Sequence, residues 1–217
     1  MPEGQSRWKQ TFFDDVEPII LKDPLSVVLG AMDKEDVMVF KYPDAVKLAG
    51  HSCVSVSGAY KLTAKALKSL YGEEVPIRGD ITVTIMGGPE DMAYGPISQV
   101  ISFITGAAPI TGFKGLKGRF KRQNNLIFDK ANSEFNTFIF QRTDTGKTVK
   151  ITFNPQVLPQ NQKMGELMSQ VLSNKATEKD KEEFINLWQG NVKEVLLNDD
   201  KYKELFKIEL IEGYDFS

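Results

Sequence analysis

The amino-acid sequence predicts an α+β fold with a mixed or antiparallel sheet, a buried motif helix and a helical C-terminal extension. A repeat of apolar residues at spacings of three and four over residues 54–71 predicts the motif helix. Three β-rich stretches, at 119–128, 135–142 and 148–153, are separated by turn residues and are typical of an antiparallel meander. Beyond Pro155 the pattern changes to amphipathic helices.

The first fifty residues predict two short helices and one strand. Asp23 and Pro24 begin a helix, because Asp is a favoured N-cap and Pro suits the first turn. Residues 37–42 are β-rich and alternate in polarity, as a strand does. A short helix that starts at Pro43 then leads the chain to Gly50.

The motif helix is the clearest element. Its apolar face consists of Val56, Ala59, Tyr60, Thr63, Ala64, Leu67 and Leu70. Gly72 supplies the C-cap, and Gly58 inside the helix indicates close packing against a neighbour. A strand at 81–86 and a buried helix at 97–104, closed by Gly106, follow it.

The chain after the meander predicts three helices. They cover residues 165–173, a longer stretch capped by Thr177, and a last short turn from Tyr202 to Phe206. We therefore divide the chain into an α+β body, residues 1–155, and a helical extension, residues 156–217, packed on it.

Composition narrows the class of protein. The chain has 217 residues, 41% of them apolar, and a net charge of -2, which favours a globular domain over a nucleic-acid binder. A single cysteine cannot form an internal disulfide. No apolar run reaches the length of a membrane span, and the N-terminus is polar, so we expect a cytoplasmic protein.

The only histidine and the only cysteine stand two positions apart, in Gly50-His51-Ser52-Cys53. Imidazole and thiolate are preferred ligands of zinc and also suit iron, nickel and copper. Two other interpretations stay open: a reactive thiol with His51 as its base, or a buried Cys53 that only packs. Two ligands do not complete a metal site, so further donors would come from elsewhere in the chain or from a second copy of it.

The loop after the strand at 81–86 offers candidate further ligands. Glu90 or Asp91 could be a hard third ligand, whereas Met86 or Met92 could be a soft one and would indicate copper or haem. Tyr94 could line the same pocket. The alternative is a solvated loop with methionines that belong to the core.

A basic run follows in the glycine-spaced segment. It consists of Lys114, Lys117, Arg119, Lys121 and Arg122. Residues 110–153 carry nine basic and three acidic side chains, which predicts a small anionic ligand at Lys114–Arg122; nucleic acid is the weaker interpretation. Charged residues that protect an exposed strand would explain the run equally well. The acidic extension could pair with this segment, within one chain or between two copies.

The motif Gly50-His51-Ser52-Cys53, with Gly58 in the apolar helix after it, resembles that of the FmdE family of formylmethanofuran dehydrogenase proteins. The similarity covers roughly residues 40–155. Val54 stands where the family has proline, and Tyr94 and Ala107 stand where it has further cysteines. The resemblance implies an FmdE-like domain, a homodimer, and a metal, usually zinc, held by His51 and Cys53.

These observations lead to one functional hypothesis with two alternatives. The protein binds zinc, another transition metal or a metal cofactor through His51 and Cys53, with Tyr94 and Met92 as further cofactor contacts. The alternatives are a zinc-dependent enzyme with an open coordination position and a haem-binding protein that uses the same pair. Whether the protein is an enzyme stays open at this point.

Overall fold

The computed structural model describes residue 4, residues 6–212 and residue 214. The strands are β1 (Ile19–Leu21), β2 (Met38–Phe40), β3 (Ile81–Ile85), β4 (Leu126–Phe128), β5 (Thr137–Arg142), β6 (Thr148–Phe153) and β7 (Phe206–Ile211). The α-helices are α1 (Pro24–Val28), α2 (Tyr42–Ala49), α3 (Val54–Tyr71), α4 (Tyr94–Thr105), α5 (Met164–Leu172) and α6 (Glu178–Leu197). Short 3-10 helices are η1 (Thr11–Asp15), η2 (Pro155–Val157) and η3 (Asp199–Lys201).

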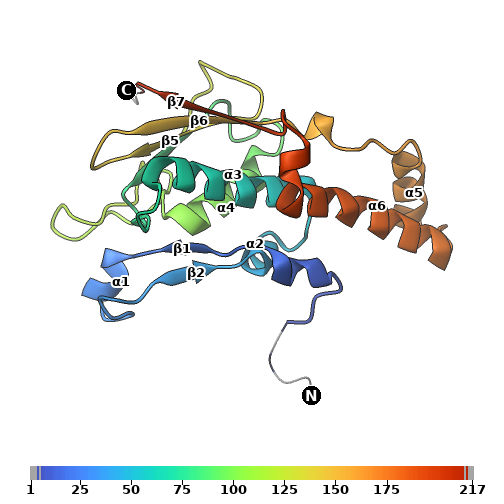
Figure 1. Cartoon of the computed structure of the whole chain (residues 1–217), viewed down its shortest axis with the longest axis horizontal. Coiled ribbons are helices and arrows are strands. Elements are labelled where there is room, and N and C mark those ends of the chain that lie inside the picture. The colour runs from blue at the N-terminus through green and yellow to red at the C-terminus, as the bar shows by residue number, and fades with distance from the viewer. Residues whose placement is uncertain (1–3, 5, 213, 215–217) are drawn as a thin grey trace.

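The elements form three layers (Figure 1). A five-stranded sheet with the order β4-β3-β5-β6-β7 covers one side of α3 and α4, and the antiparallel pair β1-β2 covers the other. The fully buried rings of Tyr42 and Tyr60 lie in this core, where they make an edge-to-face contact. The predicted α+β class is confirmed.

The sheet is mixed because β4 runs parallel to β3, whereas the other pairs are antiparallel. The predicted meander is correct for β5 and β6 but wrong for the first stretch. Only residues 126–128 of that stretch are a strand, and β3 separates them from β5. Phe120 and Asn124 have positive φ values, which a strand does not accommodate, and this explains the late start.

The predicted helix from Tyr202 to Phe206 is wrong: residues 203–205 form a turn, and Phe206 begins β7 at the edge of the sheet. β7 pairs with β6 along its whole length, from Phe206 opposite Phe153 to Ile211 opposite Thr148. The Phe153 and Phe206 rings stack with their centroids 5.1 Å apart. The free edge of β6 therefore decides the structure of a segment whose local pattern is ambiguous.

Helix α3 lies at the centre of the molecule, and it confirms the motif helix predicted over residues 54–71. Its Gly58 lies directly under Phe153, and a Cβ atom there would overlap the phenyl ring. The predicted close packing at Gly58 is therefore confirmed. Gly72 caps the helix with a φ of 62°, a conformation that glycine adopts without strain.

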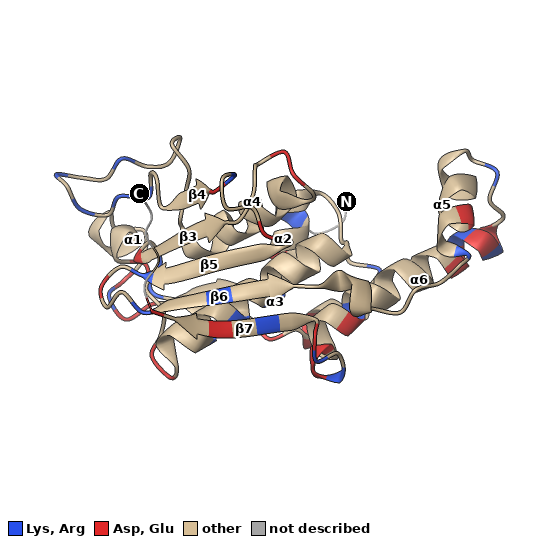
Figure 2. Ribbon diagram, turned by 90° about the horizontal axis from the view of Figure 1, so that it is seen from above, with Lys and Arg blue, Asp and Glu red and all other residues tan. Residues whose placement is uncertain are grey.

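The extension is anchored to α3 through α6 and η3. Val192, Val195 and Leu196 are buried, and Asp199 of η3 forms ion pairs with Lys61 at 3.0 Å and Lys65 at 2.6 Å. Figures 1 and 2 show that α5 and the first half of α6 project from the body as an arm. We call α5 and α6 together the α5–α6 arm; the division of the chain at residue 155 stays a prediction.

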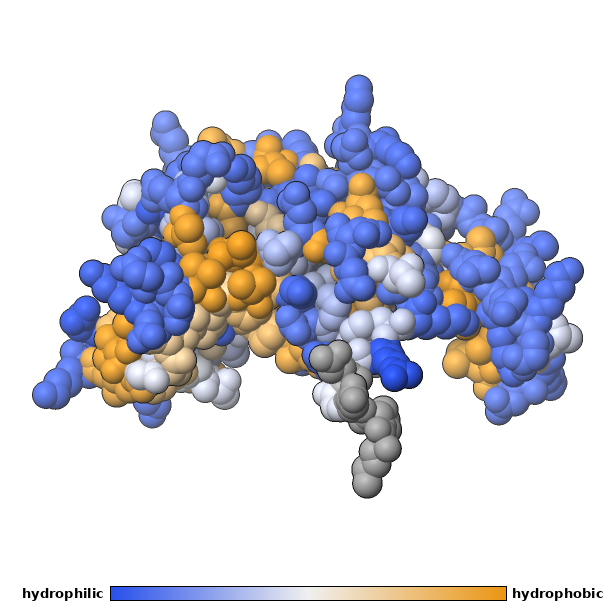
Figure 3. All heavy atoms as spheres, turned by 60° about the horizontal axis from the view of Figure 1, so that its bottom comes forward, coloured by the Kyte–Doolittle hydropathy of each residue, from blue (hydrophilic) through white to orange (hydrophobic). Residues whose placement is uncertain are grey.

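The face shown in Figure 3 is mostly hydrophilic, with apolar patches on the side that carries α1, β1 and β2 and on the α5–α6 arm. The exposed apolar side chains of the first patch include Ile20, Val28, Leu29 and Val39. Among the described residues, none of the helices has the length and apolar character of a membrane span.

Candidate functional site

The segment His51-Ser52-Cys53 joins α2 to α3, as the sequence predicts for a junction between loop and helix. Gly50 ends α2 with a φ of 74°, in the left-handed region. Cys53 is the N-cap of α3, and its Sγ accepts the Val56 N–H at 3.5 Å. The Cys53 sulfur therefore stands at the positive end of the helix dipole.

Ser52, between the two candidate ligands, is held by side chains from two helices. Its hydroxyl shares a hydrogen bond with the Tyr42 hydroxyl at 2.8 Å and donates to the Gln189 Oε1 at 3.2 Å. Its carbonyl accepts from the Trp188 Nε1 at 2.9 Å and from the Gln189 Nε2 at 3.3 Å. Helix α6 of the extension thus fixes the backbone from which His51 and Cys53 project.

Burial raises the pKa of Tyr42, against the smaller effect of its hydrogen bond to Ser52. The phenol therefore stays protonated at neutral pH and can keep its place in this hydrogen-bond chain.

His51 is exposed, and one hydrogen bond identifies its tautomer. The Nδ1 atom lies 2.9 Å from the carbonyl oxygen of Ala49. A carbonyl can only accept, so Nδ1 carries the proton, and in the neutral ring Nε2 keeps its lone pair. Histidines that bind metals usually donate a hydrogen bond from their second ring N–H to a carbonyl or carboxylate in this way.

His51 and Cys53 line one pocket of about 340 Å³ at the base of the α5–α6 arm. Met164, the first residue of α5, lines it as well, together with Trp188 and Asn191 of α6. The pocket therefore offers an imidazole nitrogen, a thiol and a thioether, the soft donors that suit zinc, copper and iron.

This donor set fits a metal only in part. Within the described part of the chain, His, Cys, Asp and Glu side chains form no group of three or more that could hold a metal ion. His51 and Cys53 supply two strong donors, and a thioether is a weak ligand for zinc. The residues present therefore fit a metal whose remaining positions are filled by a ligand from solution or by a second chain.

The structure does not bring Tyr94 and Met92 to this pocket; in the described chain, neither is among the residues that line it. Tyr94 is buried, its hydroxyl donates to the Glu134 carbonyl at 3.1 Å, and burial raises its pKa. Met92 is 58% exposed with a φ of 48°. Their roles as cofactor contacts stay predictions.

The other loop candidates have partners of their own. The Glu90 carboxylate pairs with Lys130, whose hydrogen bond lowers its pKa, and the Asp91 Oδ2 accepts the Gly88 N–H at 2.7 Å. Met86 is buried in contact with the Tyr214 hydroxyl. The arrangement agrees with a solvated loop and a core methionine.

Sequence reasoning missed Met164, Trp188 and Gln189. They lie more than 100 residues after the motif, and each belongs to a helix with a complete amphipathic pattern of its own. Trp188 was the one residue whose type indicated a long-range contact, because a partly buried Trp usually finds a hydrogen-bond acceptor for its N–H.

Residues 48–207 match a protein-family model described as FmdE, Molybdenum formylmethanofuran dehydrogenase operon. No curated protein matches the chain. The matched range begins at the end of α2 and includes the motif, α3, the strands β3 to β6 and the α5–α6 arm. It therefore includes the helix that holds Ser52. The family resemblance is confirmed: the chain belongs to the FmdE family.

Proposed function

We propose that this protein binds a transition-metal ion, zinc in the first place, or a metal-containing cofactor in the pocket lined by His51 and Cys53. The hydrogen bond from the His51 Nδ1 to the Ala49 carbonyl carries the proposal, because it leaves the Nε2 lone pair available. Membership of a family named after a molybdenum enzyme operon is consistent with a metal-linked role.

The binding role is supported more strongly than catalysis. In the described chain, no Asp or Glu lines the pocket; Ser55, Trp188 and Asn191 contribute its other polar groups. A zinc-dependent enzyme needs an acid or base within hydrogen-bond reach of the reacting atoms. We therefore infer a metal-binding or cofactor-binding protein, and keep the zinc enzyme and the haem-binding protein as alternatives.

Zinc, when bound, supplies Lewis-acid chemistry or a structural link. In this chain the His51 imidazole and the Cys53 thiol would bind the ion, and Met164 would contribute a thioether. The hydrogen bonds of Ser52 would hold the backbone of the two ligands in place. We further propose that a second copy completes the site in a homodimer, since the described chain brings only two strong donors to the pocket.

Cobalt titration tests the proposal. Co²⁺ replaces zinc and gives a thiolate charge-transfer band when a cysteine sulfur binds it. We expect this band in the wild type, its loss in Cys53→Ser, and affinity at least about tenfold lower in His51→Ala. The contribution of the Met164 thioether is tested by comparing the cobalt affinity of Met164→Leu with that of Met168→Leu, which changes an exposed methionine of the same helix. A wild-type spectrum identical to aqueous Co²⁺ would falsify the proposal.

The same samples test the homodimer. We expect the metal-loaded wild type to sediment as a dimer, and Cys53→Ser to shift toward the monomer if the metal joins two chains. A monomer that binds cobalt tightly would contradict the proposed homodimer but not the proposed metal site.

A further inference from the structure

A second pocket, which shares no lining residue with the pocket beside His51, contains a cluster of charged side chains. It has a volume of about 340 Å³, and its walls include Arg78, Gly79, Asp80, Arg119 and Arg122. These residues come from the loop before β3 and from the loop before β4. In the described chain, three guanidinium groups and a single carboxylate line it, so its charge is positive.

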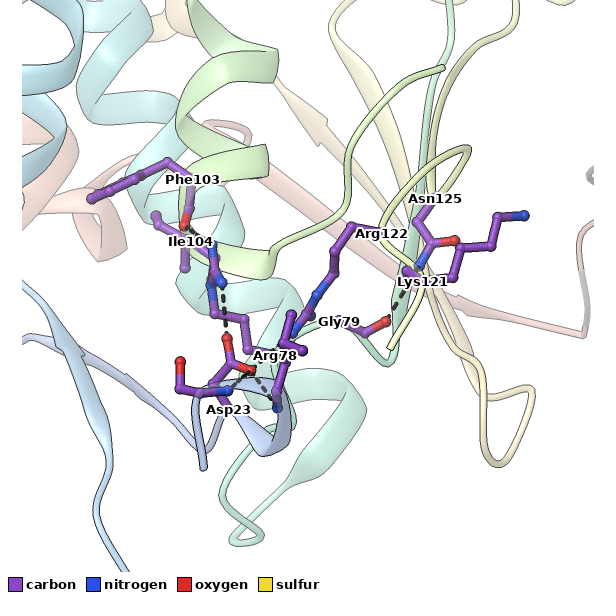
Figure 4. A network of polar contacts seen from close by, with 10 residues as sticks. Asp23, Arg78, Gly79, Phe103, Ile104, Lys121, Arg122 and Asn125 are labelled. Atoms are coloured by element: carbon purple, nitrogen blue, oxygen red, sulfur yellow. Dashed lines mark hydrogen bonds and ion pairs between the residues drawn. The ribbon is translucent and has the colours of Figure 1, made fainter. Parts of the chain in front are cut away.

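Two of the arginines share one carboxylate, that of Asp23, which is 3% exposed (Figure 4). The Asp23 Oδ2 accepts from the Arg78 Nη1 at 2.9 Å, and its Oδ1 accepts from the Arg122 Nη2 at 2.9 Å. Oδ1 also accepts the Leu25 and Ser26 N–H groups as the N-cap of α1. Asp23 therefore pairs with both guanidinium groups, and its single negative charge balances one of their two positive charges. The Asp80 carboxylate, which lines the pocket, also interacts with Arg122.

The two guanidinium groups differ in how well they are satisfied. Arg78 also donates from Nε to the Ile104 carbonyl at 3.1 Å and from Nη2 to the Phe103 carbonyl at 3.0 Å. Arg122 is only 6% exposed, and in the described chain its buried Nη1 has no hydrogen-bond partner. Burial lowers the pKa of Arg122, although Asp23 opposes this effect.

An unpaired, charged donor in a protein interior is costly, so it calls for a ligand or another explanation. Gly79 permits the arrangement, because a Cβ atom at this position would overlap the Arg122 guanidinium. Gly79 and Arg122 both line the pocket, so the unpaired donor belongs to a side chain of its wall.

The mouth of the pocket carries the third positive charge. Leu116 and Arg119 exchange two backbone hydrogen bonds, of 2.8 and 2.9 Å, which close a tight turn. After this turn Phe120 adopts a φ of 60°, and the Arg119 guanidinium lies over its ring, 4.9 Å from the centroid. The exposed Arg119 is thereby held at the pocket rather than free in solvent.

We propose that this pocket binds the phosphate or carboxylate group of a small anionic molecule, with Arg119 and Arg122 as its principal contacts. The guanidinium fork matches both groups with paired hydrogen bonds. The volume suits a small metabolite rather than a polymer. The predicted anion site at Lys114–Arg122 is thus narrowed to two of its five basic residues, joined by Arg78 from a different part of the chain.

The test is an NMR titration of ¹⁵N-labelled protein with inorganic phosphate and, separately, with citrate, at ionic strength held constant with sodium chloride. We expect saturable shifts in the backbone signals of residues 78–80 and 119–122 and in the Arg122 side-chain signals. Arg119→Gln should weaken binding about tenfold, whereas the matched control Lys114→Gln should not change it. Binding of phosphate alone or citrate alone identifies which group the pocket prefers.

A second variant, Arg122→Lys, keeps the charge but removes the fork. Provided that its circular dichroism matches the wild type, it should lose most of the affinity. The proposal is overturned if neither anion gives saturable shifts, or if Arg119→Gln and Lys114→Gln weaken binding equally, as diffuse electrostatic attraction would. The metal variants at His51 and Cys53 should leave these shifts unchanged, so the two proposals fail independently.

Discussion

Ser52 shows how a residue with no chemistry of its own can set the geometry of a site. Its four hydrogen bonds join α2, the motif and α6, so a change in the extension reaches His51 and Cys53 through the backbone. The sequence alone identified the two donors by their scarcity, but treated Ser52 as a spacer. Its partners in α6 are 136 and 137 residues away in the chain, and no local pattern predicts contacts over that separation.

Gly58 leads to the first prediction at this scale. Gly58→Ala should destabilise the protein by about 1–3 kcal/mol, because the new methyl group meets the Phe153 ring and this outweighs the better helix propensity of alanine. Gly190→Ala is the matched control: Gly190 lies in α6, and an added Cβ meets nothing within 4 Å, so it should stabilise by about 0.5–1 kcal/mol. Urea unfolding measures both; two variants that shift stability in the same direction would contradict the packing account.

At the scale of elements, local signals decided the helices and long-range pairing decided the sheet edges. Asp23, Gly72 and Thr177 cap the helices that their sequences predict. The strand β7 and the parallel pairing of β4 with β3 were not predicted, since β4 depends on the free edge of β3 and β7 on the free edge of β6. A short alternating stretch becomes a strand only where the free edge of a neighbouring strand is available to pair with it.

The contact between η3 and α3 gives a prediction for pH dependence. Burial opposes ionisation of Asp199, but hydrogen bonds from Lys65 and Lys61 outweigh it and hold its pKa below the ordinary value. A carboxyl with a lowered folded-state pKa stabilises the protein above its unfolded pKa, and this contribution is lost as the pH falls through the folded value.

Asp199→Asn should therefore lower the free energy of unfolding by about 1–3 kcal/mol at pH 7. The difference from the wild type should stay constant between about pH 5 and 8 and shrink below about pH 4. Urea unfolding as a function of pH measures this difference. Asp200→Asn, which changes the neighbouring exposed residue, serves as the control. An equal loss of unfolding free energy in this variant would show that the effect is not specific to the ion pairs of Asp199.

At the scale of the whole molecule, the extension belongs to the site. The family match runs to residue 207, through the α5–α6 arm, and the pocket beside His51 has one wall from α3 and another from that arm. Met164 and Trp188 occupy that second wall. The sequence predicted the helices of the extension but not this role, because the resemblance it could recognise ended near residue 155.

The most direct test of the account is elemental analysis with a visible spectrum on untagged protein, as purified and after refolding with zinc, iron or copper. We predict about one equivalent of metal per chain, or about half if two chains share a site, lost in His51→Ala and in Cys53→Ala. Trp188→Phe should also reduce the metal content, because it releases the Ser52 carbonyl, while Trp8→Phe should not. Protein that stays metal-free under every condition would contradict the account and reduce His51 and Cys53 to a packing pair.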